Sequence, residues 1–194
     1  MLRNAILIPL VVLLLAGCTS MATRLNGTLT PPDGHGYAIL SLTAKAFDPD
    51  SVTAYVQITD DHGRYVTNQL ADMNTDTVFG EQGMSPVEGK LILLTLTPGR
   101  YQAAQAWAHW NEPSGMWAQH RYQTFPLAAP FSVAVSETVY LGEIQFDLSL
   151  LPEMKLNNAY PRDMGHIHRV WKVPDTQAIH VRLLQTRPVQ TITQ

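Results

Sequence analysis

Alternation of apolar and polar residues is the dominant pattern of the chain beyond its first 35 residues. From Val52 to Thr59 every second residue is aliphatic, which is typical of a strand with one buried face. Residues 91–96 are apolar on both faces and predict a central strand. Turn signals such as Asp60-Asp61-His62-Gly63 separate these segments. Strands are expected at 37–42, 52–59, 77–79, 91–96, 101–110, 116–125, 131–135, 138–148 and 179–183.

Two regions depart from this alternation. Residues 72–89 are rich in Asp, Asn, Gly and Glu and predict a long loop with one short strand. The segment Asp163 to Val173 predicts a short helix capped by Asp163 and stopped by Pro174. The expected fold is therefore all-β, an antiparallel sandwich formed by a single domain over 36–194, with one possible short C-terminal helix.

The first eighteen residues have the features of an export signal. Arg3 supplies a positive charge, and residues 5–16 form an apolar run that is too short to span a bilayer as a helix. The sequence Leu15-Ala16-Gly17-Cys18 that follows resembles the lipobox of bacterial lipoproteins. That resemblance implies removal of residues 1–17 and acylation of Cys18, with 18–35 acting as a lipidated tether. Because Thr19 replaces the Asp that favours inner-membrane retention in such proteins, the expected location is the periplasmic side of the outer membrane.

Composition limits the classes of partner that are expected for this chain. It has 194 residues, of which 15% are charged, and a formal net charge of −3. A nucleic-acid partner is not expected, because such binding needs a basic surface that releases phosphate counterions. Cys18 is the only cysteine, so no intrachain disulfide is possible. The membrane, reached through the acyl chains on Cys18, is the expected partner, together with an envelope protein or a glycan.

A second resemblance concerns the middle of the chain. The motif Leu96-Thr97-Pro98-Gly99-Arg100-Tyr101, with the segments 131–133 and 139–144, is similar to the immunoglobulin-like and transthyretin-like (carboxypeptidase-regulatory-like) sandwich domains of bacterial lipoproteins. In those domains a Pro-Gly turn leads into a strand that begins with an inward Tyr. The resemblance implies the sandwich fold. It implies no particular activity, because that fold serves many functions.

The expected hairpin over 101–125 contains three of the four tryptophans. A five-residue turn would place Trp110 opposite Met116, and neither face of that hairpin is cleanly apolar. We expect Trp107 and Tyr101 to be structural, and at least one of Trp110 and Trp117 to be exposed, because a loop tip is poorly placed to bury both. Trp110, Trp117 and Tyr122 are the candidate binding residues for a glycan or a partner protein. The alternative that most of these aromatic residues fill the core remains open.

Signatures of catalysis are weak. His166 and His168 are weak metal candidates, because they would share one face of a strand but point about 200° apart on a helix. No Gly-x-Ser-x-Gly motif and no phosphate-binding loop occurs in the sequence, and no cofactor is expected. The leading hypothesis is a non-catalytic, membrane-anchored interaction or envelope-structural module. A glycan or small-ligand binding module is the alternative, and a hydrolytic or metal-dependent enzyme is the third possibility.

Overall fold

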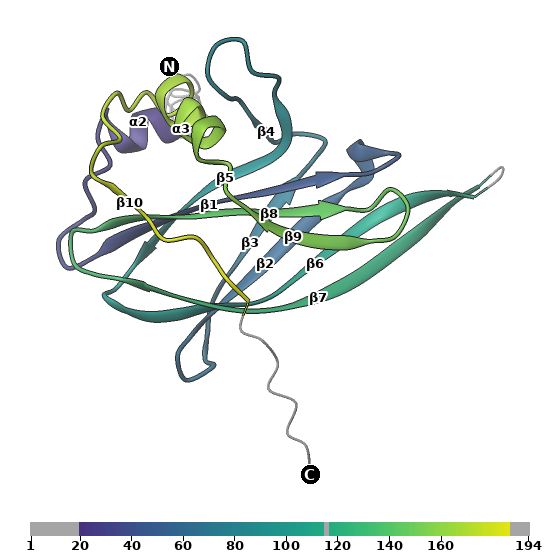
Figure 1. Cartoon of the computed structure of the whole chain (residues 1–194), viewed down its shortest axis with the longest axis horizontal. Coiled ribbons are helices and arrows are strands. Elements are labelled where there is room, and N and C mark those ends of the chain that lie inside the picture. Colours follow the sequence, from purple (N-terminus) through teal and green to yellow (C-terminus); the bar gives the residue numbers. More distant parts are fainter. Residues whose placement is uncertain (1–19, 115–116, 187–194) are drawn as a thin grey trace, which may run out of the picture.

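The computed structural model describes residues 20–114 and 117–186, and these form two packed β-sheets with helices over one of them (Figure 1). Sheet A has the strand order β10-β8-β1-β5-β4, with β9 also paired to β8, and sheet B has the order β3-β2-β6-β7. The strands are β1 (Gly36–Lys45), β2 (Thr53–Asp60), β3 (Tyr65–Asp72), β4 (Thr77–Val78), β5 (Val87–Leu96), β6 (Gly99–Ser114), β7 (Trp117–Val133), β8 (Thr138–Asp147), β9 (Glu153–Asn157) and β10 (Ile179–Val181). The helices are α2 (Met21–Leu25), the 3-10 turn η1 (Pro49–Ser51) and α3 (Tyr160–Arg169).

The predicted all-β class is confirmed, with one correction to the strand directions. β1 runs parallel to β8, and β10 also runs parallel to β8, so the sandwich is not antiparallel throughout. The finer immunoglobulin-like or transthyretin-like topology stays a prediction. Two strands, β3 and β9, were not predicted, and the segments expected at 116–125 and 131–135 belong to the single long strand β7.

The main core lies between the two sheets. Sheet B contributes small residues such as Ala54 and Ala108 together with large ones such as Trp110 and Phe125, and sheet A contributes mainly large ones such as Leu42 and Phe146. Small residues facing large ones let the two sheets interdigitate at the density of a protein interior. This core explains the aliphatic half of the alternation in β2 and in β6.

A second core covers the other face of sheet A. Ile39, Leu93 and Tyr140 point away from sheet B and pack against Leu25, Met164, Ile167 and Trp171. Strand β1 is consequently buried on both faces, which explains why almost every residue from 37 to 44 is apolar or small. The molecule thus has three layers, with sheet A in the middle (Figure 1).

The segment expected as a tether belongs to this second core where it is described. Ser20 caps α2 by accepting a hydrogen bond from the Thr23 N–H, and Leu25 is 5% exposed. Leu29 packs on the same cluster, and its carbonyl accepts a hydrogen bond from the Thr138 hydroxyl. From residue 20 onward, the segment expected as a lipidated tether over 18–35 is therefore packed on the domain, because its sparse apolar residues cover sheet A. Cys18 lies outside the described residues.

The hairpin of β6 and β7 extends well beyond the sandwich, and its register differs from the predicted one. Trp110 pairs with Arg121, not with Met116, because only residues 115 and 116 separate the two strands. The shift of five positions is odd, so each β7 residue lies on the face opposite to the expected one. An irregularity between Ala103 and Gln105 also changes the alternation of β6. Both Tyr101 and Trp110 can therefore point into the core.

The two tryptophans near the end of this hairpin should respond differently to truncation. Trp110 is 4% exposed and belongs to the main core, whereas Trp117 is 79% exposed. We expect Trp110→Ala to lower the free energy of unfolding by about 3–5 kcal/mol, as loss of a core aromatic does. Trp117→Ala, the matched control, should change it by about 0.5 kcal/mol or less. Urea unfolding of both variants measures this difference, and equal losses would contradict the assigned register.

Candidate functional site

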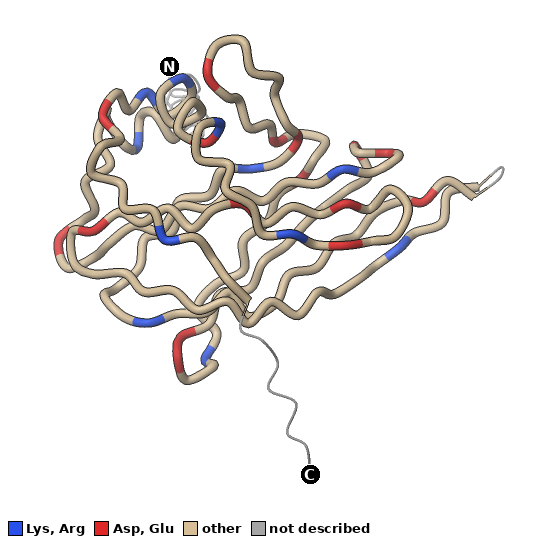
Figure 2. The backbone as a smooth tube through the Cα atoms, viewed as in Figure 1, with Lys and Arg blue, Asp and Glu red and all other residues tan. Residues whose placement is uncertain are grey.

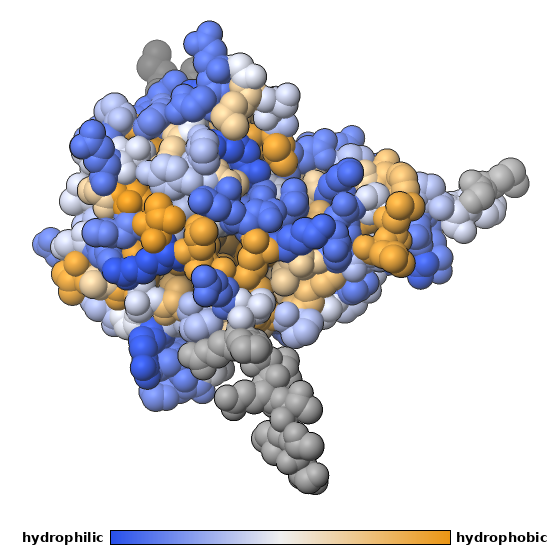
Figure 3. Space-filling view, viewed as in Figure 1, coloured by the Kyte–Doolittle hydropathy of each residue, from blue (hydrophilic) through white to orange (hydrophobic). Residues whose placement is uncertain are grey.

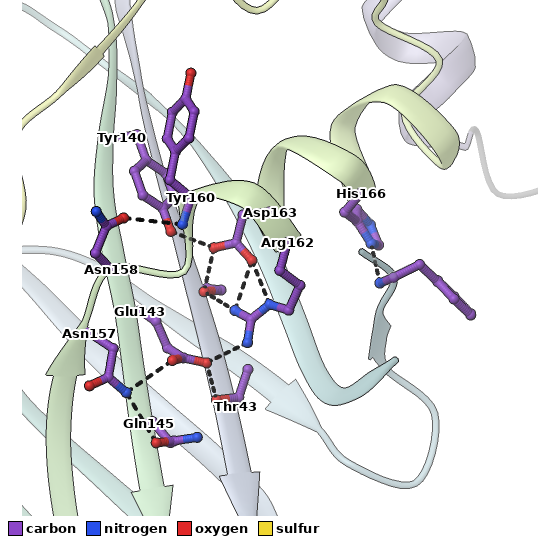
Figure 4. Close-up of polar contacts among 12 residues, drawn as sticks. Thr43, Tyr140, Glu143, Gln145, Asn157, Asn158, Tyr160, Arg162, Asp163 and His166 are labelled. Atoms are coloured by element: carbon purple, nitrogen blue, oxygen red, sulfur yellow. Dashed lines mark hydrogen bonds and ion pairs between the residues drawn. The ribbon is translucent and has the colours of Figure 1, made fainter. Parts of the chain in front are cut away.

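Two features of the structure are candidate functional sites. The first is a cluster of buried polar side chains between sheet A and α3 (Figure 4). The second is a surface of aromatic and amide side chains on the outward face of sheet B.

The backbone brings the polar cluster together through a bulge in β8. Gly142 has a φ of +92°, and the pairing of β1 with β8 shifts register between Ile39 and Ser41. The extra residue places Tyr140 and Glu143 on the same face of the sheet although they are three positions apart. A Cβ at Gly142 would lie 2.6 Å from the Asn157 carbonyl oxygen, so β9 can pair there only beside a glycine.

Arg162 is the centre of this cluster. Its Nε donates to Asp163 Oδ1 at 2.8 Å, and its two terminal nitrogens donate to Glu143 Oε1 at 2.6 Å and to Ser41 Oγ at 2.8 Å. Hydroxyl groups donate further hydrogen bonds to the two carboxylates. Ser41 and Tyr140 each donate to Asp163 Oδ2 at 2.7 Å. In the same way Thr43 donates to Glu143 at 2.7 Å. No buried side-chain nitrogen or oxygen among the described residues lacks a partner.

The charges of the cluster are set by burial and by these contacts. Burial alone would raise the pKa of Glu143, but Arg162 and the hydrogen bond from Thr43 hold it below its ordinary value. Burial raises the pKa of Asp163, against the opposing effect of Arg162 and the donated hydrogen bonds. Burial and the nearby Asp163 also raise the pKa of Tyr140, so that its hydroxyl stays protonated and remains a donor. The polar groups of the cluster are hydrogen-bonded to one another, so the cluster fixes the position of α3 on sheet A.

The second half of α3 holds the loop between β4 and β5. His166 is buried, and its Nδ1 accepts a hydrogen bond from the Phe79 N–H at 3.0 Å. Arg169 donates to the Gly80 carbonyl at 2.5 Å, and His168 lies 3.1 Å from a carboxylate oxygen of Glu81. The loop therefore lies directly against the helix, which permits no Cβ at Gly165 because it would meet the Glu81 nitrogen at 2.3 Å.

The two histidines of α3 do not act together. The predicted helix is confirmed, although it begins at Tyr160, so Asp163 lies in its first turn and is not its cap. On this helix His166 and His168 bind different parts of the β4–β5 loop. Across residues 20–114 and 117–186 no group of three or more His, Cys, Asp or Glu side chains could hold a metal ion.

The outward face of sheet B carries a continuous strip of aromatic rings. Tyr55 stacks on Trp107 with centroids 5.1 Å apart, and the His109 ring follows at 5.8 Å from Tyr55. His109 in turn lies 4.9 Å from the Tyr122 ring and 5.7 Å from the His120 ring. We call these five residues the outer aromatic strip. It crosses β2, β6 and β7 and continues onto the projecting part of the hairpin.

The register shows which side chains surround this strip, because residues directly opposite each other share a face. The rows across β3, β2, β6 and β7 are Leu70–Tyr55–Trp107–Thr124, Asn68–Gln57–Gln105–Pro126 and Asp72–Thr53–His109–Tyr122. These described rows contain no Lys, Arg or Glu, and their one carboxylate, Asp72, lies at the β3 margin. The face therefore offers ring surfaces, amides and hydroxyls with almost no charge.

The predicted binding residues do not form one patch. Trp110 is in the core, which corrects its assignment as a surface residue; the two-residue connection sets a register that turns it inward. Trp117 and Tyr122 are both exposed, at 79% and 59%, but the register puts them on opposite faces of the hairpin. The expectation that one tip tryptophan is exposed is confirmed by Trp117. Trp107, expected in the core, is half-buried on the outer face against Tyr55.

Sequence reasoning did not identify Tyr55 and His109 as parts of a binding surface, although the alternation in β2 puts Tyr55 at a solvent-facing position. The sequence carries one sign of this surface. Among the polar residues that alternate with the aliphatic ones in β2, an aromatic residue occupies an outward position. Hollows in the surface lie elsewhere: two of about 440 Å³ flank Arg100, whose guanidinium binds Asp61 at 3.0 Å. The strip residues line neither of them.

No protein-family model matches the chain, and no curated protein is similar to it. Among solved structures, a leucine-rich repeat protein from Bacteroides thetaiotaomicron VPI-5482 matches 60% of this chain at 13% sequence identity with a TM-score of 0.34. The matched region spans 14% of that protein's length.

The contact of His166 with the β4–β5 loop predicts a dependence of stability on pH. Burial, with Arg162 and Arg169 nearby, lowers the pKa of His166 to about 4, while the unfolded chain has its ordinary pKa of about 6.5. The unfolded state therefore takes up the proton first, and stability is full above pH 6.5 and lost as the pH falls toward 4. We expect a loss of about 2 kcal/mol between pH 7 and pH 5 from this group.

Urea unfolding at the two pH values tests this expectation. His166→Asn keeps an acceptor for the Phe79 N–H but cannot titrate, so this part of the loss should disappear. His62→Asn is the matched control, because that side chain is 72% exposed in the β2–β3 turn, and it should keep the full pH dependence. An unchanged loss in His166→Asn would exclude His166 as its source.

Proposed function

We propose that the protein is a lipoprotein anchored through Cys18 on the periplasmic side of the outer membrane, where it acts as a non-catalytic module that binds another envelope protein. The export signal and the lipobox support the anchor. In the described chain no helix is long and apolar enough to cross a bilayer.

The observation that carries the binding proposal is the projecting hairpin of β6 and β7. Its outer part, residues 113–114 and 117–122, leaves the sandwich and is solvent-exposed on both faces. β7 forms an edge of sheet B, so the N–H and C=O groups along that edge are available to a partner strand. Binding residues concentrate on such projections from a rigid scaffold.

Apolar side chains support the same end of the molecule as the interface. Leu150 and Leu151, in the turn between β8 and β9, are 80% and 85% exposed. Figure 3 shows apolar side chains gathered at the right of the view, the side on which Figure 1 places this turn. Phe47 is exposed just beyond the β1 residue that pairs with Asp147. Exposed apolar side chains gathered at one end are typical of a surface that a partner protein covers.

Two experiments test this proposal, one for the anchor and one for the interface. Cys18→Ala should leave an uncleaved precursor without acyl label, because the thiol is the site of acylation. A photo-crosslinking residue at Trp117 should give a specific envelope adduct, and the same residue at His62, on the β2–β3 turn, should give none. Normal cleavage and labelling of Cys18→Ala would overturn the anchor, and identical adducts at both positions would overturn the interface.

A second candidate function, glycan binding, is favoured by the outer aromatic strip. Aromatic rings contact the apolar C–H faces of sugars, and the amides of Gln57 and Gln105 can bond their hydroxyls. The near absence of charge on this face favours a neutral polysaccharide. Such a ligand would lie across a flat sheet face, since the hollows beside Arg100 are not lined by the strip.

Isothermal titration with neutral oligosaccharides tests this candidate. Tyr122→Ala should weaken the affinity at least tenfold if the strip binds sugar, because that ring is exposed and continues the strip. Trp117→Ala removes an exposed ring from the opposite face and should leave the affinity unchanged. Equal effects of the two variants, or no heat of binding to the unmodified protein, would exclude the strip as a glycan site.

A further inference from the structure

The distance between the acylated residue and the folded body is short. The described chain begins at Ser20, whose hydroxyl already caps α2. Only two residue steps separate Cys18 from this cap, which allows a span of about 7 Å at most. A free tether over 18–35 would instead have a typical span of about 20–25 Å.

The helix at this point is fixed to the domain by several contacts. Leu25 is buried in the second core with Trp171 and Ile167. Arg24 donates a hydrogen bond to the Thr95 hydroxyl of β5 at 3.2 Å. Met21, at the first turn, also packs on the second core. The chain is therefore part of the folded body from α2 onward, and acyl chains on Cys18 would hold that body directly at the lipid surface.

From this geometry we infer that the end of the domain formed by α2, the C-terminal end of α3 and the following residues 170–172 rests on the bilayer that carries the acyl chains. This inference rests on the proposed acylation of Cys18 and adds an orientation to it. The protein is held as a docked body, with the N-terminal end of α2 toward the headgroups.

The side chains of this end fit an anionic lipid surface. Arg24, Arg169 and Lys172 are exposed there, and Figure 2 shows Lys and Arg positions, with Asp and Glu positions among them, around the N-terminal end of the described chain. The exposed side chain of Val170 lies between two of them in sequence. The nearby carboxylate of Glu81 is engaged by His168. Each basic side chain near an anionic membrane surface adds a favourable attraction to the hydrophobic anchoring by the acyl chains.

The inferred orientation also determines how far the other surfaces of the domain lie from the membrane. In Figure 1 the N-terminal end of the described chain lies at the upper left, whereas the projecting ends of β6 and β7 lie at the right and the β2–β3 turn at the bottom. A body resting on its α2–α3 end therefore keeps the hairpin away from the point of attachment, where a second envelope component can reach it.

Site-specific fluorescence quenching on the acylated full-length protein tests this inference. Acylation consumes the only native thiol, so an introduced cysteine is the one site for a fluorophore. Val170→Cys probes the α3 end, His62→Cys probes the β2–β3 turn, and Leu150→Cys probes the apolar β8–β9 turn. The protein is bound to vesicles of phosphatidylethanolamine and phosphatidylglycerol that contain spin-labelled lipid, and mass spectrometry establishes the acyl chains on Cys18.

We expect quenching at position 170 to be several-fold stronger than at 62 and 150. A Gly-Ser spacer as long as 18–35, inserted between Thr19 and Ser20, should reduce the signal at 170 to that at 62, because it frees the body from the surface. Acylated protein with equal quenching at all three positions, or with its strongest quenching at 150, would overturn the docked orientation alone. Absence of acyl chains would overturn the proposed anchor and this inference with it.

Discussion

The burial of Arg162 is the constraint on which the layer of helices over sheet A depends. A guanidinium in this position has a large desolvation cost, and the structure offsets it with Asp163, Glu143 and the Ser41 hydroxyl. These partners come from three different elements: α3 itself, β8 and β1. The bonds therefore define one position of α3 on sheet A, because any sliding of the helix would leave a buried charge without its partner.

The core between the two sheets does not account for the whole fold. Sheet A carries apolar residues on both faces, and its outer face would be exposed without the helices. α3 and the residues after it cover that face, and α2 packs beside them through Leu25. Apolar packing supplies the stability of this layer, whereas the directional bonds of Arg162 supply its register. The β4–β5 loop is then fixed in turn, through His166 and Arg169.

The sequence predicted the elements whose pattern is local. The alternation in β2, the continuous apolar run in β5 and the phase of Met164, Ile167 and Trp171 each report a burial pattern that a few neighbouring residues determine. The hairpin register could not be obtained in this way, because it depends on a two-residue connection and on an irregularity near Ala103. β3 was missed because as an edge strand it has few buried residues. The parallel pairing of β1 with β8 joins segments about one hundred residues apart, and no local pattern encodes it.

The candidate sites illustrate the same limit. Ser41 and Thr43 interrupt a strand that is otherwise apolar, and this is the one local sign of a buried polar cluster. Their partners, Asp163 and Glu143, could be identified only once the bulge at Gly142 and the placement of α3 were known. The outer aromatic strip likewise arises from three strands, and Tyr55 joins Trp107 only because β2 pairs with β6. Individual residue types were visible in the sequence, but their assembly depends on long-range register.

Under the proposed acylation of Cys18, the packing of α2 changes how the protein can act. A domain on a long unstructured tether samples many orientations, and a partner must select the productive one. A domain joined to its anchor by two residues loses most of that freedom in advance, so less orientational entropy remains to be lost on binding. Leu25 joins α2 to sheet A, and the main core joins sheet A to the hairpin strands of sheet B. Under the proposed anchoring, attachment at one end of the fold and an exposed hairpin at the other would therefore be parts of a single mechanical arrangement, in which the two packed sheets connect α2 to the hairpin.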